Sequence, residues 1–104
     1  MMVVIIAEIQ VTQKDPETFE VTVTESTTTT HTVKLRPDYY KRLTGGKATP
    51  EALIKESFLF LLERESNTMV LPSFKLPMIS QYFPEYEKTV VRQLKREITK
   101  KVKE

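Results

Sequence analysis

Residues 49–65 read TPEALIKESFLFLLERE and combine strong helix-start signals with more apolar side chains than one helix face holds. Thr49 offers a hydroxyl N-cap, Pro50 follows at the first helical position, and Glu51 places an acid in the first turn. The apolar side chains are Ile54, Phe58, Leu61 and Leu62 on the main stripe, with Leu53, Leu59 and Phe60 around it. We therefore predict a central helix packed on more than one side, against a sheet and against later helices or a second subunit.

Residues 3–36, which precede this helix, alternate apolar and polar side chains in three runs. The runs cover residues 3–12, 19–24 and 31–36. A period of two is typical of strands with one buried face, and short links between the runs favour antiparallel neighbours. These residues therefore predict a three-stranded antiparallel meander.

The rest of the chain, residues 37–104, has a helical period. Residues 37–43 predict a short helix that Gly45 and Gly46 end. Three prolines interrupt residues 69–86, so we predict no more than a short helix near 77–82. A last helix begins at about Glu85, and its apolar stripe consists of Val91, Leu94, Ile98 and Val102, with Val90 beside it.

Together these patterns predict one α+β domain over residues 1–104: a β-meander (3–36), then a helical part (37–104) that ends in a basic amphipathic helix. The 104-residue chain is 39% hydrophobic and 29% charged, as in a soluble globular protein. Its lack of cysteine excludes disulfides, zinc-thiolate sites and thiol nucleophiles. The apolar start MMVVIIAEIQ is too short to span a membrane and lacks a basic leader, so we expect a cytoplasmic protein.

The stretch ESTTTTHTVKL, residues 25–35, raises the question of a phosphate or metal site. A phosphate cradle usually needs glycines, and this stretch has none. A metal site needs several ligands, and no carboxylate stands at a recognisable spacing from His31, the only histidine. We predict two strand ends and a tight turn, with a structural His31, no metal and no cofactor.

Catalytic residues are not evident either. The candidate paired carboxylates are Glu63, Glu65, Glu85 and Glu87. Acid–base catalysis would need a pocket that moves their pKa values apart, and Glu63 and Glu65 face different directions on a helix. We therefore predict no catalytic residue and rank a small-molecule enzyme as a third hypothesis.

The net charge of +2 divides unevenly: residues 88–104 carry +5 and residues 1–87 carry −3. Three interpretations of the basic end stay open, in this order: a solvated helix on the body, one helix of a dimer, or a phosphate-binding segment. No aromatic residue follows Tyr86, which argues against base stacking on single strands.

The order of elements in residues 31–65 resembles the ribbon-helix-helix DNA-binding proteins. A strand, a short helix, a glycine turn and a helix that starts Thr-Pro-Glu follow one another. In that family the paired strands of a dimer enter the major groove, and alternate side chains read bases. The resemblance implies that Thr32, Lys34 and Arg36 contact nucleic acid, which we keep as the second hypothesis.

A second resemblance covers residues 31–90. The motifs LTGG, SFLFLLERE, SF and YFPEYE are similar to those of a group of short uncharacterised prokaryotic proteins. This resemblance implies kinship of fold and no established activity, so it assigns no catalytic residue.

The first hypothesis for function is a small non-enzymatic binding or regulatory protein that acts through protein–protein contacts. The apolar excess of the central helix predicts a homodimer and, beyond it, an unidentified protein partner. The predicted interaction surface consists of Leu59, Phe60, Tyr82, Phe83 and Tyr86.

Overall fold

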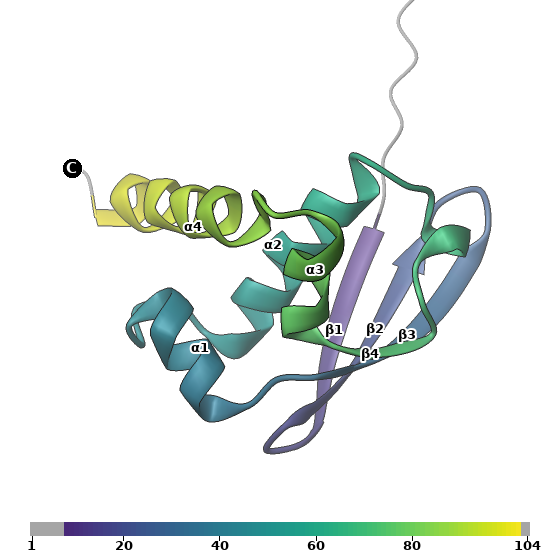
Figure 1. The fold of residues 1–104 in the computed structure, drawn as a ribbon, viewed down its shortest axis with the longest axis horizontal. Helices are drawn as coiled ribbons and strands as arrows, with labels where there is room; N and C mark the ends of the chain where they lie inside the picture. The colour runs from purple at the N-terminus through teal and green to yellow at the C-terminus, as the bar shows by residue number, and fades with distance from the viewer. Residues whose placement is uncertain (1–7, 103–104) are drawn as a thin grey trace, which may run out of the picture.

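The computed structural model describes the backbone of residues 8–102 and the side chains of residues 8–96. The chain is α+β, as predicted, with a sheet first and helices after it (Figure 1). The elements are β1 (Glu8–Asp15), β2 (Thr18–Thr24), β3 (Thr28–Lys34), α1 (Pro37–Thr44), α2 (Pro50–Leu62), η1 (Asn67–Met69), β4 (Ser73–Lys75), η2 (Leu76–Met78), α3 (Ile79–Tyr82) and α4 (Tyr86–Val102). The predicted strand residues 3–7 and the stripe side chains of Ile98 and Val102 lie outside the described part.

The sheet has four strands in the order β1-β2-β3-β4. β1, β2 and β3 form the predicted antiparallel meander, but β4 pairs parallel to β3, with Val33 opposite Phe74. The prediction of a three-stranded, purely antiparallel sheet is therefore wrong. β4 is only three residues long and directly follows Pro72, so its own sequence carries no strand period. It exists because β3 offers a free edge, where the Thr32 amide donates to the Pro72 carbonyl at 2.7 Å.

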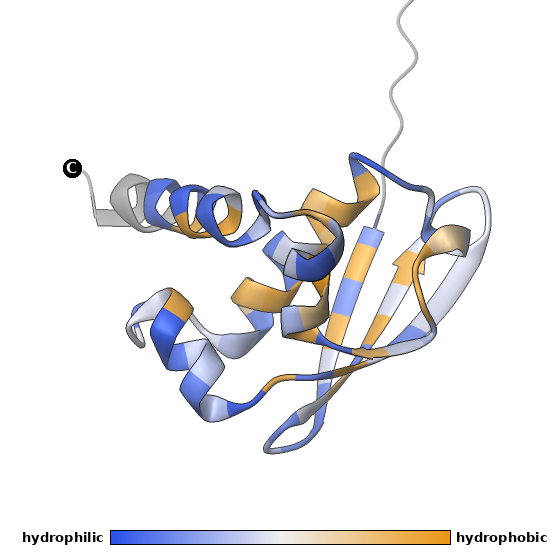
Figure 2. Ribbon diagram, viewed as in Figure 1, coloured by the Kyte–Doolittle hydropathy of each residue, from blue (hydrophilic) through white to orange (hydrophobic). Residues whose placement is uncertain are grey.

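One face of the sheet is buried and the other is open. On β2, Phe19, Val21 and Val23 are buried, while Thr22 and Thr24 point to the other side. The same alternation of apolar and polar residues follows β1 (Figure 2). The helices cover only the apolar face, so the threonine-rich face stays in contact with solvent.

α2 packs on two sides, as predicted. Toward the sheet, the Phe58 ring lies 5.4 Å from that of His31 and 6.0 Å from that of Phe74. Toward α4, the Phe60 ring lies 5.3 Å from that of Tyr86. The second partner of α2 is therefore a later helix of the same chain.

The helix ends follow local signals. The Thr49 hydroxyl accepts a hydrogen bond from the Ala52 amide at 3.0 Å, and Gly45 ends α1 with φ of 62°. The predicted short helix near 77–82 is present as η2 and α3. α2 ends at Leu62 rather than at about Glu65, because the chain turns there toward η1. None of the helices in the described part combines the length and apolar character that a bilayer span requires.

A buried polar pair joins α2 to α4. Ser57 and Tyr86 are both fully buried, and their hydroxyl oxygens are 2.6 Å apart. The Ser57 hydroxyl donates to the Leu53 carbonyl at 2.8 Å, so the Tyr86 hydroxyl must be the donor to Ser57. Burial raises the pKa of Tyr86 above its usual range, and the group stays a neutral donor.

Ser57→Ala should lower the free energy of unfolding by about 1–3 kcal/mol, because it leaves the buried Tyr86 hydroxyl without an acceptor. Ser57→Ala combined with Tyr86→Phe should cost less than the sum of the two single changes. Urea denaturation gives the free energy of unfolding of the wild type, the two single variants and the double variant. Thr68→Ala, which removes an exposed hydroxyl bond to Ser66, is the control and should change stability by less than about 0.5 kcal/mol. Additive single effects would contradict the coupling.

A second polar cluster joins α1 to α4. The Arg42 guanidinium donates to both carboxylate oxygens of Glu87, at 3.2 and 3.0 Å, and the Tyr39 hydroxyl donates to the same carboxylate at 2.8 Å. The hydrogen bond from Arg42, helped by that from Tyr39, holds the pKa of Glu87 below its ordinary value of 4.5. Burial, followed by the bond to Glu87, raises the pKa of Tyr39 above its usual range.

Acid should therefore weaken the contact between α1 and α4. Because the folded-state pKa of Glu87 is lowered, its stabilising effect is complete above pH 4.5 and is lost as pH falls through the folded-state pKa. We expect the stability difference between the wild type and Glu87→Gln to be largest near neutral pH and to shrink in acid. Urea denaturation over a pH series tests this. Glu17→Gln changes an exposed carboxylate and is the matched control; a Glu87→Gln difference that is constant with pH would refute the assignment.

Candidate binding groove

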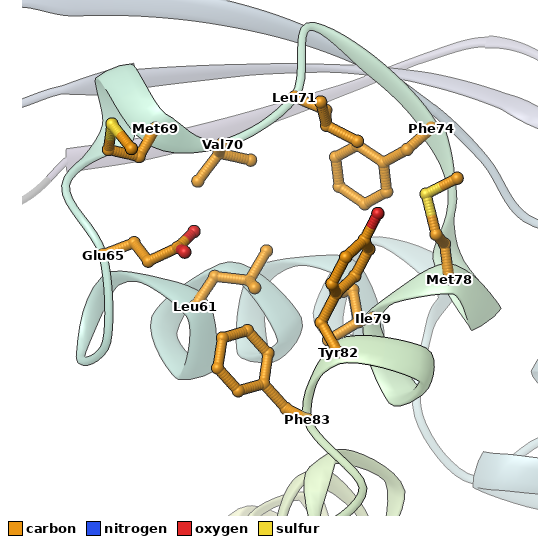
Figure 3. A pocket seen from close by; sticks show the side chains of 10 residues that line it. All are labelled: Leu61, Glu65, Met69, Val70, Leu71, Phe74, Met78, Ile79, Tyr82 and Phe83. Atoms are coloured by element: carbon orange, nitrogen blue, oxygen red, sulfur yellow. The ribbon is translucent and has the colours of Figure 1, made fainter.

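A groove of about 360 Å³ opens between the C-terminal end of α2, the segment that contains η1 and β4, and α3 (Figure 3). All of its lining side chains except one are apolar or aromatic. They are Leu61, Glu65, Met69, Val70, Leu71, Phe74, Met78, Ile79, Tyr82 and Phe83. The groove therefore offers shape and apolar area rather than a cluster of reactive groups.

The groove has a buried floor and an exposed rim. Leu61, Val70, Phe74 and Ile79 are buried in the core and form the floor. The rim is unusually apolar for a surface: Met69 is 68% exposed, Tyr82 67% and Leu71 46%. Single exposed apolar residues are normal, but three around one hollow make this surface a candidate interaction site.

Asn67 holds one wall of the groove in place. Its side-chain amide donates to the carbonyls of Val23, at 3.3 Å, and Thr27, at 2.6 Å, and its backbone amide donates to the Glu25 carboxylate at 3.3 Å. The side chain is only 2% exposed. These bonds attach η1 to the end of β2 and to the turn between β2 and β3. Met69 is the last residue of η1, so its position is fixed by the same bonds.

His31 holds the next part of the same wall. Its Nδ1 lies 2.8 Å from the Leu71 carbonyl oxygen, which can only accept, so Nδ1 donates. In the neutral ring Nε2 then accepts from the Thr29 hydroxyl at 2.9 Å. The ring is buried against Phe58, and its nitrogens are occupied, which is the geometry of a structural histidine. Within the described residues, no three His, Asp or Glu side chains are grouped as metal ligands would be.

The structure places the four carboxylates singled out in the sequence in three different settings. Glu63 and Glu85 both contact Arg64, at 3.5 and 3.4 Å, and its guanidinium stacks 3.6 Å from the Phe60 ring centre. Glu87 belongs to the cluster with Arg42. Glu65 borders the groove and has no ion-pair partner among the described residues.

The predicted interaction surface is only partly at the surface. Tyr82 and Phe83 line the groove, but Phe60 is 4% exposed and Tyr86 is fully buried, so these two cannot meet a partner of the folded chain. Both side chains point into the contact between α2 and α4. The helical pattern of the sequence shows that a helix face is apolar, but it does not show whether another helix covers that face. Leu59 is exposed, but it lies in another hollow, beside Ile9 and Lys55.

Sequence reasoning missed several rim and floor residues of the groove, above all Met69, Leu71 and Met78. The available signal was the apolar, proline-rich composition of residues 69–86, from which we predicted helix breaks and, as parts of an interaction surface, only Tyr82, Phe83 and Tyr86. These side chains meet Leu61 only because β4 pairs with β3 and brings the segment back over the sheet edge.

The possible nucleic-acid contacts Thr32, Lys34 and Arg36 do not form a groove-entering ribbon in this chain. β4 pairs with β3 over Thr32–Lys34, so at these residues neither edge of β3 is free to pair with a second copy, and Arg36 lies beyond the end of the strand. The Lys34 ammonium donates to the Thr18 hydroxyl at 2.8 Å, and Arg36 contacts Asp38 at 3.4 Å. DNA binding through these residues stays a prediction. The arrangement of β3 between β2 and β4 differs from the two-chain ribbon that the resemblance implies.

No protein-family model matches the chain, and no curated protein and no solved structure matches it. The resemblances to ribbon-helix-helix proteins and to a group of short prokaryotic proteins therefore stay predictions. Any function has to be argued from the surfaces described above.

Asn67→Asp should loosen the groove wall, because a carboxylate in place of the amide faces two carbonyl oxygens and donates to neither. We expect a loss of about 1–3 kcal/mol in the free energy of unfolding. Amide hydrogen exchange should quicken at residues 25–28 and 68–71 before it does so in α2. Thr68→Asp is the control, because it adds the same charge at an exposed position one residue away. If both variants lost the same free energy of unfolding, the anchoring role of Asn67 would be contradicted.

Proposed function

We propose that this protein is a non-enzymatic binding protein whose groove takes an apolar segment of a partner protein. The observation that carries the proposal is the exposed rim of Met69, Leu71 and Tyr82 around a buried apolar floor. Methionine and aromatic side chains are well suited to such surfaces, because they are adaptable or bury a large area at low entropic cost.

The polar content of the groove favours a polypeptide over a small molecule. Small-molecule sites usually direct several polar groups at the ligand. Here the side chains that line the groove offer one carboxylate, on Glu65, and one hydroxyl, on Tyr82 (Figure 3). The lining also holds no nucleophile with a neighbouring base, so it supports binding rather than catalysis.

The charge at the groove edge specifies the partner further. Glu65 lines the groove and has no ion-pair partner among the described residues, whereas neighbouring Glu63 contacts Arg64. An acidic edge beside an apolar hollow complements a segment in which apolar anchors are followed by Lys or Arg. We therefore infer an apolar segment with a flanking basic residue as the occupant.

The predicted homodimer is a second possible use of the same groove. The apolar excess of α2, which suggested a dimer, is covered by α4 within the chain. The exposed rim is the remaining reason for self-association, and light scattering distinguishes a 12 kDa monomer from a dimer.

Selection of random peptides on the immobilised protein tests the proposal directly. We expect the selected peptides to combine apolar anchors with a basic residue. Leu71→Asp should weaken them at least tenfold, about 1.4 kcal/mol, because it removes an apolar contact at the rim and puts a hydrated charge where the apolar anchors bind. Titration calorimetry gives the affinities.

Leu59→Asp is the matched control, since Leu59 is exposed to a similar extent (38% against 46%) but lies outside the groove. It should leave the affinity within about twofold. Peptides that bind Leu71→Asp as well as the wild type, or a selection that yields no binder, would contradict the proposal.

A further inference from the structure

A row of cations on α4 lies on a different part of the molecule from the groove. Lys88, Arg92 and Lys95, here called the α4 cationic stripe, are all exposed and line one hollow of about 500 Å³ beside α1. Their spacings of four and three residues place them on one face of the helix. Leu43 and Val91 form the apolar part of this hollow.

Among the side chains that the structure describes, no carboxylate pairs with the cations of the stripe. Glu87, the one acid that lines the hollow, is bound to Arg42 by two hydrogen bonds. Within the part of the chain whose side chains are described, Lys88, Arg92 and Lys95 make no ion pair. The stripe is therefore a concentrated positive surface rather than half of an internal salt-bridge network.

Helix stability does not explain this charge pattern. Lys88 is the third residue of α4, near the positive end of the helix dipole, where an acid would be favourable. Lys88 and Arg92 are like charges four residues apart, as are Arg92 and Arg96, and such pairs destabilise a helix. A binding role accounts for Lys88 at a position where the helix itself would favour an acid, and for the like charges that follow it on the same face.

The length of the stripe matches a nucleic-acid backbone. Seven residues of helix from Lys88 to Lys95 span about 10 Å at about 1.5 Å per residue. One strand of a duplex presents a phosphate about every 3.4 Å along its axis, so about three phosphates cover the same length. We propose that the α4 cationic stripe binds the phosphate backbone of duplex nucleic acid without reading its sequence.

The form of the stripe favours this partner over other anions. A single phosphate group is best held by converging donors, whereas these cations stand in a row. Single strands are usually held by aromatic stacking as well, and no aromatic side chain lines this hollow. An acidic polypeptide is the competing partner, and it becomes an outcome of the test.

Fluorescence anisotropy with a labelled duplex of arbitrary sequence measures the binding. We expect the logarithm of affinity to fall with the logarithm of salt at a slope of about −2.7, a loss of about 40-fold between 50 and 200 mM salt. Lys88→Gln, Arg92→Gln and Lys95→Gln should each reduce the slope by about one. The triple variant should lose the binding and keep or raise its melting temperature, because it removes a like-charge pair.

The matched control changes three exposed lysines elsewhere, Lys14, Lys55 and Lys75, to Gln and should keep the slope. Lys34→Gln with Arg36→Gln tests the β3 face in the same assay. No binding at low salt, an equal loss in the lysine control or a loss only in the β3 variant would overturn the proposal. So would polyglutamate that competes as well as unlabelled duplex at equal charge, since the surface would then serve acidic proteins.

Discussion

The fold depends on the burial of α2 on two sides at once. Phe58 packs toward the sheet, and Phe60 packs toward Tyr86 of α4. A fully buried phenylalanine contributes about 1.5–3 kcal/mol, so leaving either side open would remove a large part of the stability of a domain this small. The sheet, whose first three strands precede α2 in the chain, covers one side of α2. The other side is covered by α4, the last helix of the described residues.

The connection that brings α4 into place also builds the groove. Residues 63–85 leave the end of α2, pass over the sheet edge as β4 and return through α3. Polar anchors fix this path: Asn67 binds two carbonyls of the β2–β3 region, and His31 binds the Leu71 carbonyl. Along this path Met69, Leu71 and Tyr82 stay exposed around a buried apolar floor. The resulting hollow is the surface that we propose as the binding site for another chain.

The two proposed surfaces rest on different physical effects. The groove offers apolar area with one acidic edge, and the outer side of α4 offers a row of cations. α4 contributes to both surfaces. Its outer side carries the cations, and its inner side, with Tyr86, Val90 and Leu94, is buried in the core that supports the groove. Apolar burial depends weakly on moderate salt, whereas binding to phosphates is strongly screened by it. The proposed binding of an apolar segment and the proposed binding of phosphates can therefore be distinguished by their salt dependence as well as by substitution.

The sequence by itself determined the features that depend on neighbours a few residues away. The alternation along β1–β3, the Thr49–Pro50 helix start and the left-handed Gly45 cap are local, and each is present in the described residues, although β3 runs over Thr28–Lys34 rather than the predicted 31–36. Local patterns also excluded a glycine-rich phosphate cradle around Thr27–Thr30. These features follow from backbone propensity, capping and the period of burial, which a short segment carries alone.

Only the tertiary structure decided which apolar faces are covered and which remain open. The hydrogen bond from His31 to Leu71 joins residues 40 positions apart, and that from Tyr39 to Glu87 joins residues 48 apart. Phe60 and Tyr82 were both predicted to lie on the interaction surface, yet Phe60 is buried against Tyr86 of α4 and Tyr82 stands exposed on the groove rim. A side chain becomes part of a site through what the rest of the chain leaves uncovered, and no short segment contains that information.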